Sequence, residues 1–254
     1  MLRTDVVLLK PTPEQEKKLF HLAEQSSLLW NQTNYERRQA FFKHEKNPEY
    51  AKQCYTFKTS QHFRAIGTGK AQPLLKKLAE SWSSFWELKQ MLAQGRLPPH
   101  IKRVNPPRYW KDRTKEQTEI KMFCVRNDCY RIRGDAITLG KNLKVRYAAD
   151  RIRNGKKGRL DVVYDSLSNR WYAHIPVKVR RHTRPHQTTK HGSIDLGICN
   201  IATLYAPDER PLIYSGRAVL SDWVYHTKKI AQLQSQLKQK QYTSIQIQKL
   251  FRKR

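Results

Sequence analysis

Acidic side chains are scarce in this sequence. Its 254 residues include 21 Asp and Glu against 50 Lys and Arg, so the formal net charge is +29 at pH 7. Most of the positive excess lies after residue 95. Like charges repel one another in a compact chain, and a polyanion relieves that repulsion. Nucleic acid is the expected partner because neutralised phosphates release their counterions, although basic ribosomal and membrane-surface proteins share this composition.

Long apolar runs are missing from the start of the chain. The run Val6–Leu9 is too short for the core of a signal peptide or for a membrane span, and the acidic Asp5 precedes it. We therefore expect a cytoplasmic protein with no membrane partner.

Cysteine is sparse as well. The four cysteines show no framework spacing, and Cys124 and Cys129 are separated by four residues without a second pair that would complete a zinc site. Structural thiols in a reducing compartment are the favoured interpretation, and no zinc is expected.

Apolar residues are nevertheless numerous enough for a folded core, since hydrophobic residues make up 38% of the chain. A short strand is predicted at Val6–Lys10. A helix then begins after Thr12, where Pro13 suits the first helical position and Gln15 completes a capping box, and it continues toward Phe41.

Weaker helical patterns cover 49–66 and 72–93. The second contains an aromatic stripe with Trp82, Phe85 and Trp86. Residues of this kind at helical spacing favour a helix-packing core, with a ligand-binding surface as the alternative.

Proline and basic residues dominate 95–115, and from about Ile120 the apolar period changes to two. Several short strands at regular spacing indicate a small barrel. The strands are predicted at 130–139, 143–147, 160–164 and 171–179, with a hairpin turn at 165–170. A polar linker, 182–191, leads to the last segment.

One carboxylate is distinctive in that last segment. Alternation along a predicted strand places Ile194, Leu196 and Ile198 on an inward face, with Asp195 and Gly197 on the other. A glycine within a strand weakens it unless something approaches the backbone closely. A strand with a central aspartate, followed by two antiparallel strands and a helix, is typical of the start of ribonuclease-H-like nucleases, in which the aspartate binds a divalent metal. An aspartate on a solvated edge is the alternative.

Further acids are few. After Asp195 the sequence contains Asp208 and Glu209 in a predicted turn, and Asp222 near the start of a long helix predicted from about Ala218. Two-metal hydrolysis of a phosphodiester needs several carboxylates around ions roughly 3.5–4 Å apart. Catalysis by this chain alone is therefore not expected.

Several stretches resemble the TnpB (OrfB) family, insertion-sequence nucleases regarded as ancestors of type V CRISPR effectors. The most specific is Gly192–Thr203, which is similar to the family's first RuvC block and places Asp195 at its first metal-binding acid. The others are Leu9–Glu16, Leu28–Asn31, Ala79–Leu88 with Pro106–Tyr109, and the basic tail Lys249–Arg254. Nothing matches the family's later Glu, zinc ribbon or final Asp, so we expect a truncated, N-terminal portion of such a protein.

The resemblance implies an α+β fold with three regions. Residues 1–10 and 116–185 would form a small wedge-type β-barrel, and 11–115 a helical recognition lobe inserted in it. Residues 191–254 would form an incomplete RuvC-like (ribonuclease-H-like) domain with the first three strands and a helix. We expect 192–254 to be the least stable part, because an open three-stranded sheet leaves an unpaired edge and a half-covered apolar face.

The resemblance also implies partners and a cofactor. Family members bind guide RNA and target DNA, and base pairing reads most of the target. No small-molecule substrate is expected. The family's cofactor is Mg²⁺, but with Asp195 as its only catalytic and metal-binding acid this chain is not expected to hold Mg²⁺ stably by itself. The candidate phosphate-binding residues are Arg103, Arg108, Lys111, Lys156, Lys157 and Arg159, with Tyr109 and Trp110 as candidates for stacking on bases.

Three functions remain open at this point. The leading hypothesis is a TnpB-like protein that binds guide RNA and target DNA but does not cleave DNA alone. The second is a guide-RNA-dependent protein that represses or marks DNA without cutting it. The third is a basic RNA-binding protein without a guided target, which would show steep salt dependence and no sequence preference.

Overall fold

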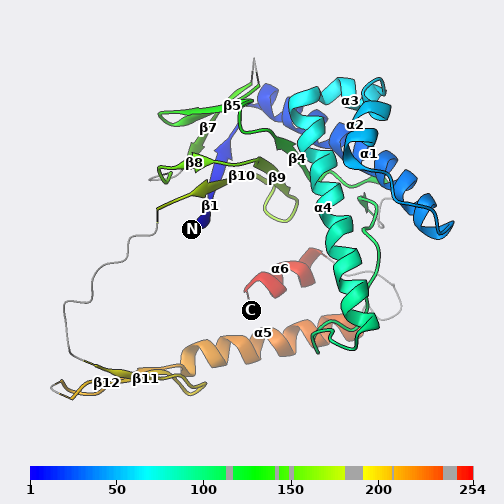
Figure 1. Cartoon of the computed structure of the whole chain (residues 1–254). Coiled ribbons are helices and arrows are strands. Elements are labelled where there is room, and N and C mark those ends of the chain that lie inside the picture. Colours follow the sequence, from blue (N-terminus) through cyan, green and yellow to red (C-terminus); the bar gives the residue numbers. More distant parts are fainter. Residues whose placement is uncertain are drawn as a thin grey trace. The chain divides into compact units, whose positions relative to one another are not determined.

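The computed structural model describes residues 1–112, 117–140, 143–148, 152–180, 191–207, 209–236 and 245–253. The chain divides into two compact units, Met1–Arg181 and His182–Arg254, and each is described by itself (Figure 1). The predicted linker 182–191 lies outside the described residues apart from its last position.

An antiparallel sheet organises the first unit. Its strand order over the described residues is β4-β9-β10-β1-β7-β6-β5, with β8 beside β10. The strands are β1 Leu2–Lys10, β4 Met122–Val125, β5 Tyr130–Arg133, β6 Ala136–Leu139, β7 Lys144–Ala148, β8 Lys156–Lys157, β9 Leu160–Asp165 and β10 Arg170–Lys178. A separate short pair joins β2 Lys111–Asp112 to β3 Gln117–Thr118.

The sheet curls into a half-barrel, which corrects the prediction of a small barrel (Figure 1). In the described part of the chain, β4 and β5 end the strand order and are not paired with each other. Helices α1 Pro13–Phe42 and α4 Thr68–Ala93 both pack on β4. They cover the face of β4 that carries Met122 and Cys124, at one end of the strand order.

One predicted strand is wrong. The segment 130–139 folds as a hairpin, β5–β6, in which Arg133 pairs with Ala136. Gly134 begins the two-residue loop with a φ of +55°, a conformation that glycine adopts without strain. The other hairpin is confirmed, because Asp165 at the end of β9 pairs with Arg170 at the start of β10.

The helical part begins as predicted. The side chain of Thr12 accepts from the Gln15 backbone N–H, the Gln15 side chain accepts from the Thr12 N–H, and Pro13 occupies the first turn of α1. The predicted helical stretch 49–66 is divided into α2 Tyr50–Phe57 and α3 Gln61–Ile66. The side chain of Ser60 accepts from the Phe63 N–H, so a new cap separates the two helices.

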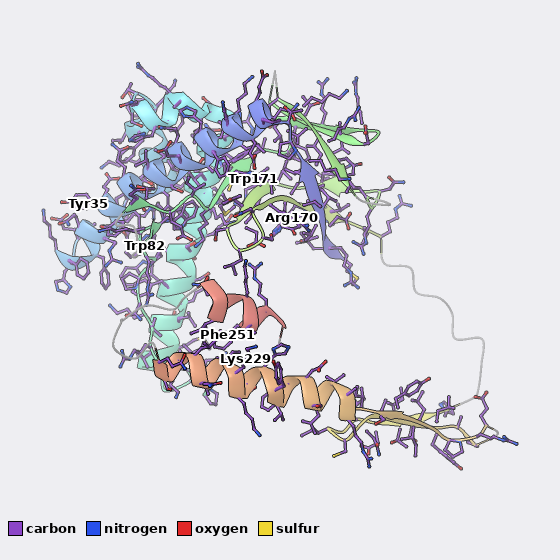
Figure 2. The ribbon with its side chains drawn as sticks, turned by 180° about the vertical axis from the view of Figure 1, so that it is seen from behind. Tyr35, Trp82, Arg170, Trp171, Lys229 and Phe251 are labelled. Carbon is purple, nitrogen blue, oxygen red and sulfur yellow. The ribbon has the colours of Figure 1, made fainter. Side chains whose placement is uncertain are left out.

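Two hydrophobic cores share the strand β4. Phe123 and Val125 belong to the core of the sheet, whereas Met122 and Cys124 belong to the core between the helices. Successive side chains of a strand point to opposite faces, so a strand between two cores is apolar throughout. Figure 2 labels one large residue of each core, Trp171 on β10 and Trp82 on α4.

The aromatic stripe of α4 is mainly core, as predicted. Trp82 and Phe85 are buried, and Phe41 of α1 packs against both rings. Trp86 is the exception, with an exposed ring that is still in contact with Phe41.

The second unit contains the three predicted strands and the long helix. Strands β11 Ser193–Asp195, β12 Asn200–Tyr205 and β13 Leu212–Ser215 form an antiparallel sheet in that order. They are followed by α5 Arg217–Gln236 and α6 Ile245–Lys253. Among the described residues, no helix is long and apolar enough to cross a membrane.

Candidate nucleic-acid interface

The basic proline segment is fixed to α1 through its main chain. Asn31 accepts from the Trp110 N–H at 2.7 Å and donates to the Trp110 carbonyl at 3.1 Å. Asn34 donates to the Pro107 carbonyl at 3.0 Å, and Trp30 Nε1 donates to the Arg108 carbonyl at 3.2 Å. Because α1 holds the backbone of this extended segment by hydrogen bonds, the Cα positions from which the segment's side chains point outward are fixed.

Those outward side chains are cationic and aromatic. Arg103, Arg108 and Lys111 are exposed, and the Tyr109 side chain is 39% exposed. In the described part of the chain none of the three cations forms an ion pair. The segment can therefore offer charge to a phosphate and a ring to a base.

Two residues of this surface were not predicted. The guanidinium carbon of Arg38 lies 5.2 Å from the Tyr109 ring centroid and 5.3 Å from the Phe42 ring centroid, and its Nη1 donates to the Pro107 carbonyl at 3.0 Å. Asn34, Arg38 and Phe42 follow one another at intervals of four residues on α1, so they lie along the same face of the helix. This spacing was visible in the sequence, but it did not show that the face meets residues 107–109.

Trp110 was a wrong candidate for base stacking. Its side chain is only 7% exposed and stacks on Trp30 with ring centroids 4.3 Å apart and an interplanar angle of 12°. The Lys121 ammonium lies 5.7 Å from the centroid of the Trp110 ring. Trp110 is a core residue that helps to hold the segment on α1, and its ring is not available to a base.

Arg159 is already paired. Its guanidinium contacts the Glu80 carboxylate of α4 at 3.0 and 3.3 Å and the Asp161 carboxylate at 3.7 Å. Burial is the largest single influence on the pKa of Arg159 and lowers it, but hydrogen bonding to Glu80 together with the negative charges of Glu80 and Asp161 and the nearby Cys124 outweighs burial, so the pKa is raised above its usual value. We therefore interpret Arg159 as a link between α4 and the sheet, whereas we retain Lys156 and Lys157 of β8 as candidates.

Asp195 lies at the end of β11, opposite Thr203 of β12. Ile194 is opposite Leu204, so Asp195 and Ile194 point to opposite faces, as predicted. The predicted inward face is wrong, however, because Ile194 is 62% exposed and Leu196 is 74% exposed in this chain.

The position of Gly197 also differs from the prediction. Gly197 follows the strand and lies in the turn to β12, where its N–H donates to the Asn200 carbonyl at 3.0 Å. A Cβ at this position would lie 3.1 Å from the same oxygen. The close backbone contact that Gly197 permits is therefore with Asn200, within the same turn.

The residues that the structure describes do not assemble a magnesium site around Asp195. In the described part of the chain, no three His, Cys, Asp or Glu side chains come together in a way that could hold a metal. Glu209 lies in the turn between β12 and β13 and Asp222 on α5, while Asp208 is outside the described residues. A single exposed carboxylate, Asp195, cannot position two metal ions by itself.

Comparisons with known proteins agree with the sequence motifs. A family model described as "OrfB_IS605: Probable transposase" matches residues 174–254. The "TnpB-like protein ORF457" of Acidianus two-tailed virus is 36% identical over 254 aligned positions, which cover 92% of this chain and 55% of that protein. The chain therefore spans about half the length of this curated relative.

Two solved structures show weaker similarity. One is described as "Cryo-EM structure of the Cas12f1-sgRNA-target DNA complex", with a TM-score of 0.38, 13% identity, and coverage of 100% of this chain and 64% of that one. The other, "Cryo-EM structure of CRISPR-Cas12f Ternary Complex", has a TM-score of 0.43, 11% identity, and coverage of 91% and 54%. The family assignment does not depend on either similarity.

The match of the family model relates residues 174–254 to a family described as probable transposases. Together with the sequence similarity to the viral TnpB-like protein, this match supports assignment of the chain to the TnpB/OrfB family.

Proposed function

We propose that this chain binds a structured guide RNA and the DNA that the RNA pairs with. The geometry that carries the proposal is the segment Pro106–Lys111, which α1 holds by its backbone while Arg108 and Tyr109 face outward. Arg38 and Phe42 extend this surface along α1. The similarity to the TnpB/OrfB family supports RNA as the first partner and base pairing as the source of target specificity.

The remaining candidates support the same proposal from other elements. Lys156 and Lys157 of β8 lie beside the end of β10, where Lys157 pairs with Val177 and Lys156 with Lys178. We propose that these two lysines contact backbone phosphates of the nucleic acid, because they add positive charge to β8, the short strand beside β10. The wedge, recognition-lobe and RuvC-like regions, with the boundaries given above, remain part of this proposal.

The first test is the RNA that the chain retains. The protein is purified from its source at low salt, and the co-purified RNA is sequenced. We expect one structured RNA species from the end of the insertion element. A preparation that retains no RNA and binds none at low salt would contradict the proposal.

The second test changes the exposed arginine. We expect Arg108→Gln to weaken RNA binding severalfold and to reduce the salt dependence of the affinity by about one phosphate contact. Arg64→Gln is the matched control, since Arg64 is exposed on α3 outside this surface. Equal effects of both substitutions, measured by fluorescence anisotropy over a range of salt concentrations, would exclude Arg108 from the interface.

A second candidate function is RNA-guided DNA binding without cleavage. The observation that favours it is that no group of three His, Cys, Asp or Glu side chains that could hold a metal occurs among the described residues. We propose that the 254-residue chain does not cleave DNA alone, with or without Mg²⁺. Magnesium-dependent cutting that is lost in Asp195→Ala would refute this. If Asp195→Ala abolishes repression or marking of the bound DNA while the affinity is unchanged, the pure binding function is excluded instead.

A competition binding experiment distinguishes the third function, unguided RNA binding, from the two RNA-guided functions. An RNA-guided protein prefers its own RNA to an unrelated RNA of the same length. A purely basic protein binds both equally, and both affinities fall together as salt rises.

A further inference from the structure

A depression of about 680 Å³ lies where α1, the start of α4 and the end of β6 meet. It belongs to the first unit and is separate from the segment Pro106–Lys111. Its lining combines three leucines with three lysines, namely Leu22, Leu139, Leu143, Lys17, Lys18 and Lys70. An apolar floor with a few charged groups around it is typical of a ligand-binding pocket.

The floor of the depression is fixed in place. Leu139 and Leu143 are 3% and 7% exposed, and the Leu139 N–H donates to the Leu143 carbonyl at 2.7 Å. Leu22 of α1 packs against both hydrophobic cores. The three leucines therefore form a small, preformed apolar surface rather than a flexible one.

Lys70 lines the depression beside this floor. Its ammonium lies 3.3 Å from the place that a Cβ on Gly140 would occupy, and Gly140 has a φ of +75°, so glycine is favoured there for two reasons. Lys70 is half-buried, and burial lowers the pKa of its ammonium. In the part of the chain that the structure describes, Lys70 forms no ion pair. A partly desolvated cation of this kind favours an anionic ligand.

The rim adds positive charge along α1. Lys17 and Lys18 are exposed on its second turn, and His21 follows one turn later. Among the described residues of the lining, Glu14 is the one acid, and it lies in the first turn of α1. The charge around the depression is therefore positive, and an anion is attracted to it.

We propose that this depression binds one unpaired nucleotide of an RNA strand. The base lies on the leucine floor and the phosphate contacts Lys70, with Lys17 and Lys18 near the adjoining backbone. Binding pockets for small ligands span about 300–1,000 Å³, so one nucleotide fits, whereas a paired base in a duplex cannot enter. This inference rests on the proposed function, because it names a second contact of the same RNA.

The test compares three single substitutions in the full chain. Binding of fluorescein-labelled single-stranded RNA of mixed sequence is measured by anisotropy at constant salt. We expect Lys70→Met to weaken binding about tenfold, because a half-buried charged contact is lost. Lys70→Arg keeps the charge and stays within about threefold of the unchanged chain. Lys58→Met, which removes an exposed lysine outside the depression, is the matched control, with an effect of about twofold.

A mononucleotide separates the two proposals. AMP is titrated into methyl-labelled chain, and the leucine signals are followed by NMR. We expect signals of the floor leucines to shift in the unchanged chain and not in Lys70→Met. If the chain binds RNA but Lys70→Met behaves like Lys58→Met, the pocket is refuted and the proposed function stands. If RNA does not bind, the proposed function fails. The AMP titration then tests the pocket by itself, and an absence of shifts in the leucine signals refutes the pocket.

Discussion

Asn34 illustrates how a single buried side chain connects the core to the candidate interface. It is fully buried on α1, accepts from Trp82 Nε1 at 2.9 Å and donates to the Pro107 carbonyl at 3.0 Å. One amide thus joins α1, α4 and the proline segment. An amide is suited to this role because it carries both a donor and an acceptor.

Replacing Asn34 should therefore cost stability. We expect Asn34→Ala to lower the free energy of unfolding by about 1–3 kcal/mol, because the Trp82 N–H loses its partner and the Pro107 carbonyl keeps only the hydrogen bond from Arg38. Urea denaturation followed by tryptophan fluorescence measures the change. Asn105→Ala, an exposed position beside the same segment, should change it by less than about 0.5 kcal/mol. Similar values for the two variants would show that Asn34 is not a structural link.

At the scale of the elements, the two sheets differ in how they are covered. Strands β1, β9 and β10 carry core residues of the first unit, including Val7, Val162 and Ile175. Along β11 and β13 every residue is exposed. The free energy of local opening depends on the buried apolar contacts that opening breaks.

We therefore expect hydrogen exchange to distinguish these elements. Amides of β11, β12 and β13 should exchange at least about a hundredfold faster than those of β1, β9 and β10, which corresponds to about 3 kcal/mol in opening free energy. Mass spectrometry of deuterated peptides measures this in one experiment. Equal protection of the two sheets would contradict the expectation that 192–254 is the least stable part.

The net charge of +29 acts on the whole molecule. Repulsion among the cations opposes the compact state, while the same cations attract a polyanion. Salt screens both interactions. The stability of the free chain and its affinity for RNA should therefore respond to salt in opposite directions.

Raising the NaCl concentration from about 50 to about 200 mM should increase the melting temperature of the free chain by about 2–4 °C, equivalent to about 1 kcal/mol. The same change should weaken RNA binding by about a hundredfold or more if several phosphates are contacted. Differential scanning fluorimetry and anisotropy measure the two effects. A melting temperature that falls with salt would show that ion pairs, rather than net repulsion, dominate the stability.

Local chemistry in the sequence was sufficient for the elements whose ends are set by nearby residues. Thr12, Pro13 and Gln15 predicted the start of α1 because a capping box involves only neighbouring groups. The hairpin at Gly134-Asp135 was missed although its loop residues are typical of a two-residue turn. That error came from following the alternating pattern through the turn.

The sequence by itself determined the basic character of this protein, the start of its first helix and the motifs that resemble the TnpB/OrfB family, since each depends on composition or neighbouring residues. Only the tertiary structure decided which candidates are available to a partner. Trp110 and Arg159 look like binding residues in the sequence, but Trp30 stacks on the first and Glu80 pairs with the second. The sequence did not identify Lys70 or Arg38 as candidate binding residues. Contacts between residues distant in the sequence depend on packing of the whole chain, and local patterns do not contain that information.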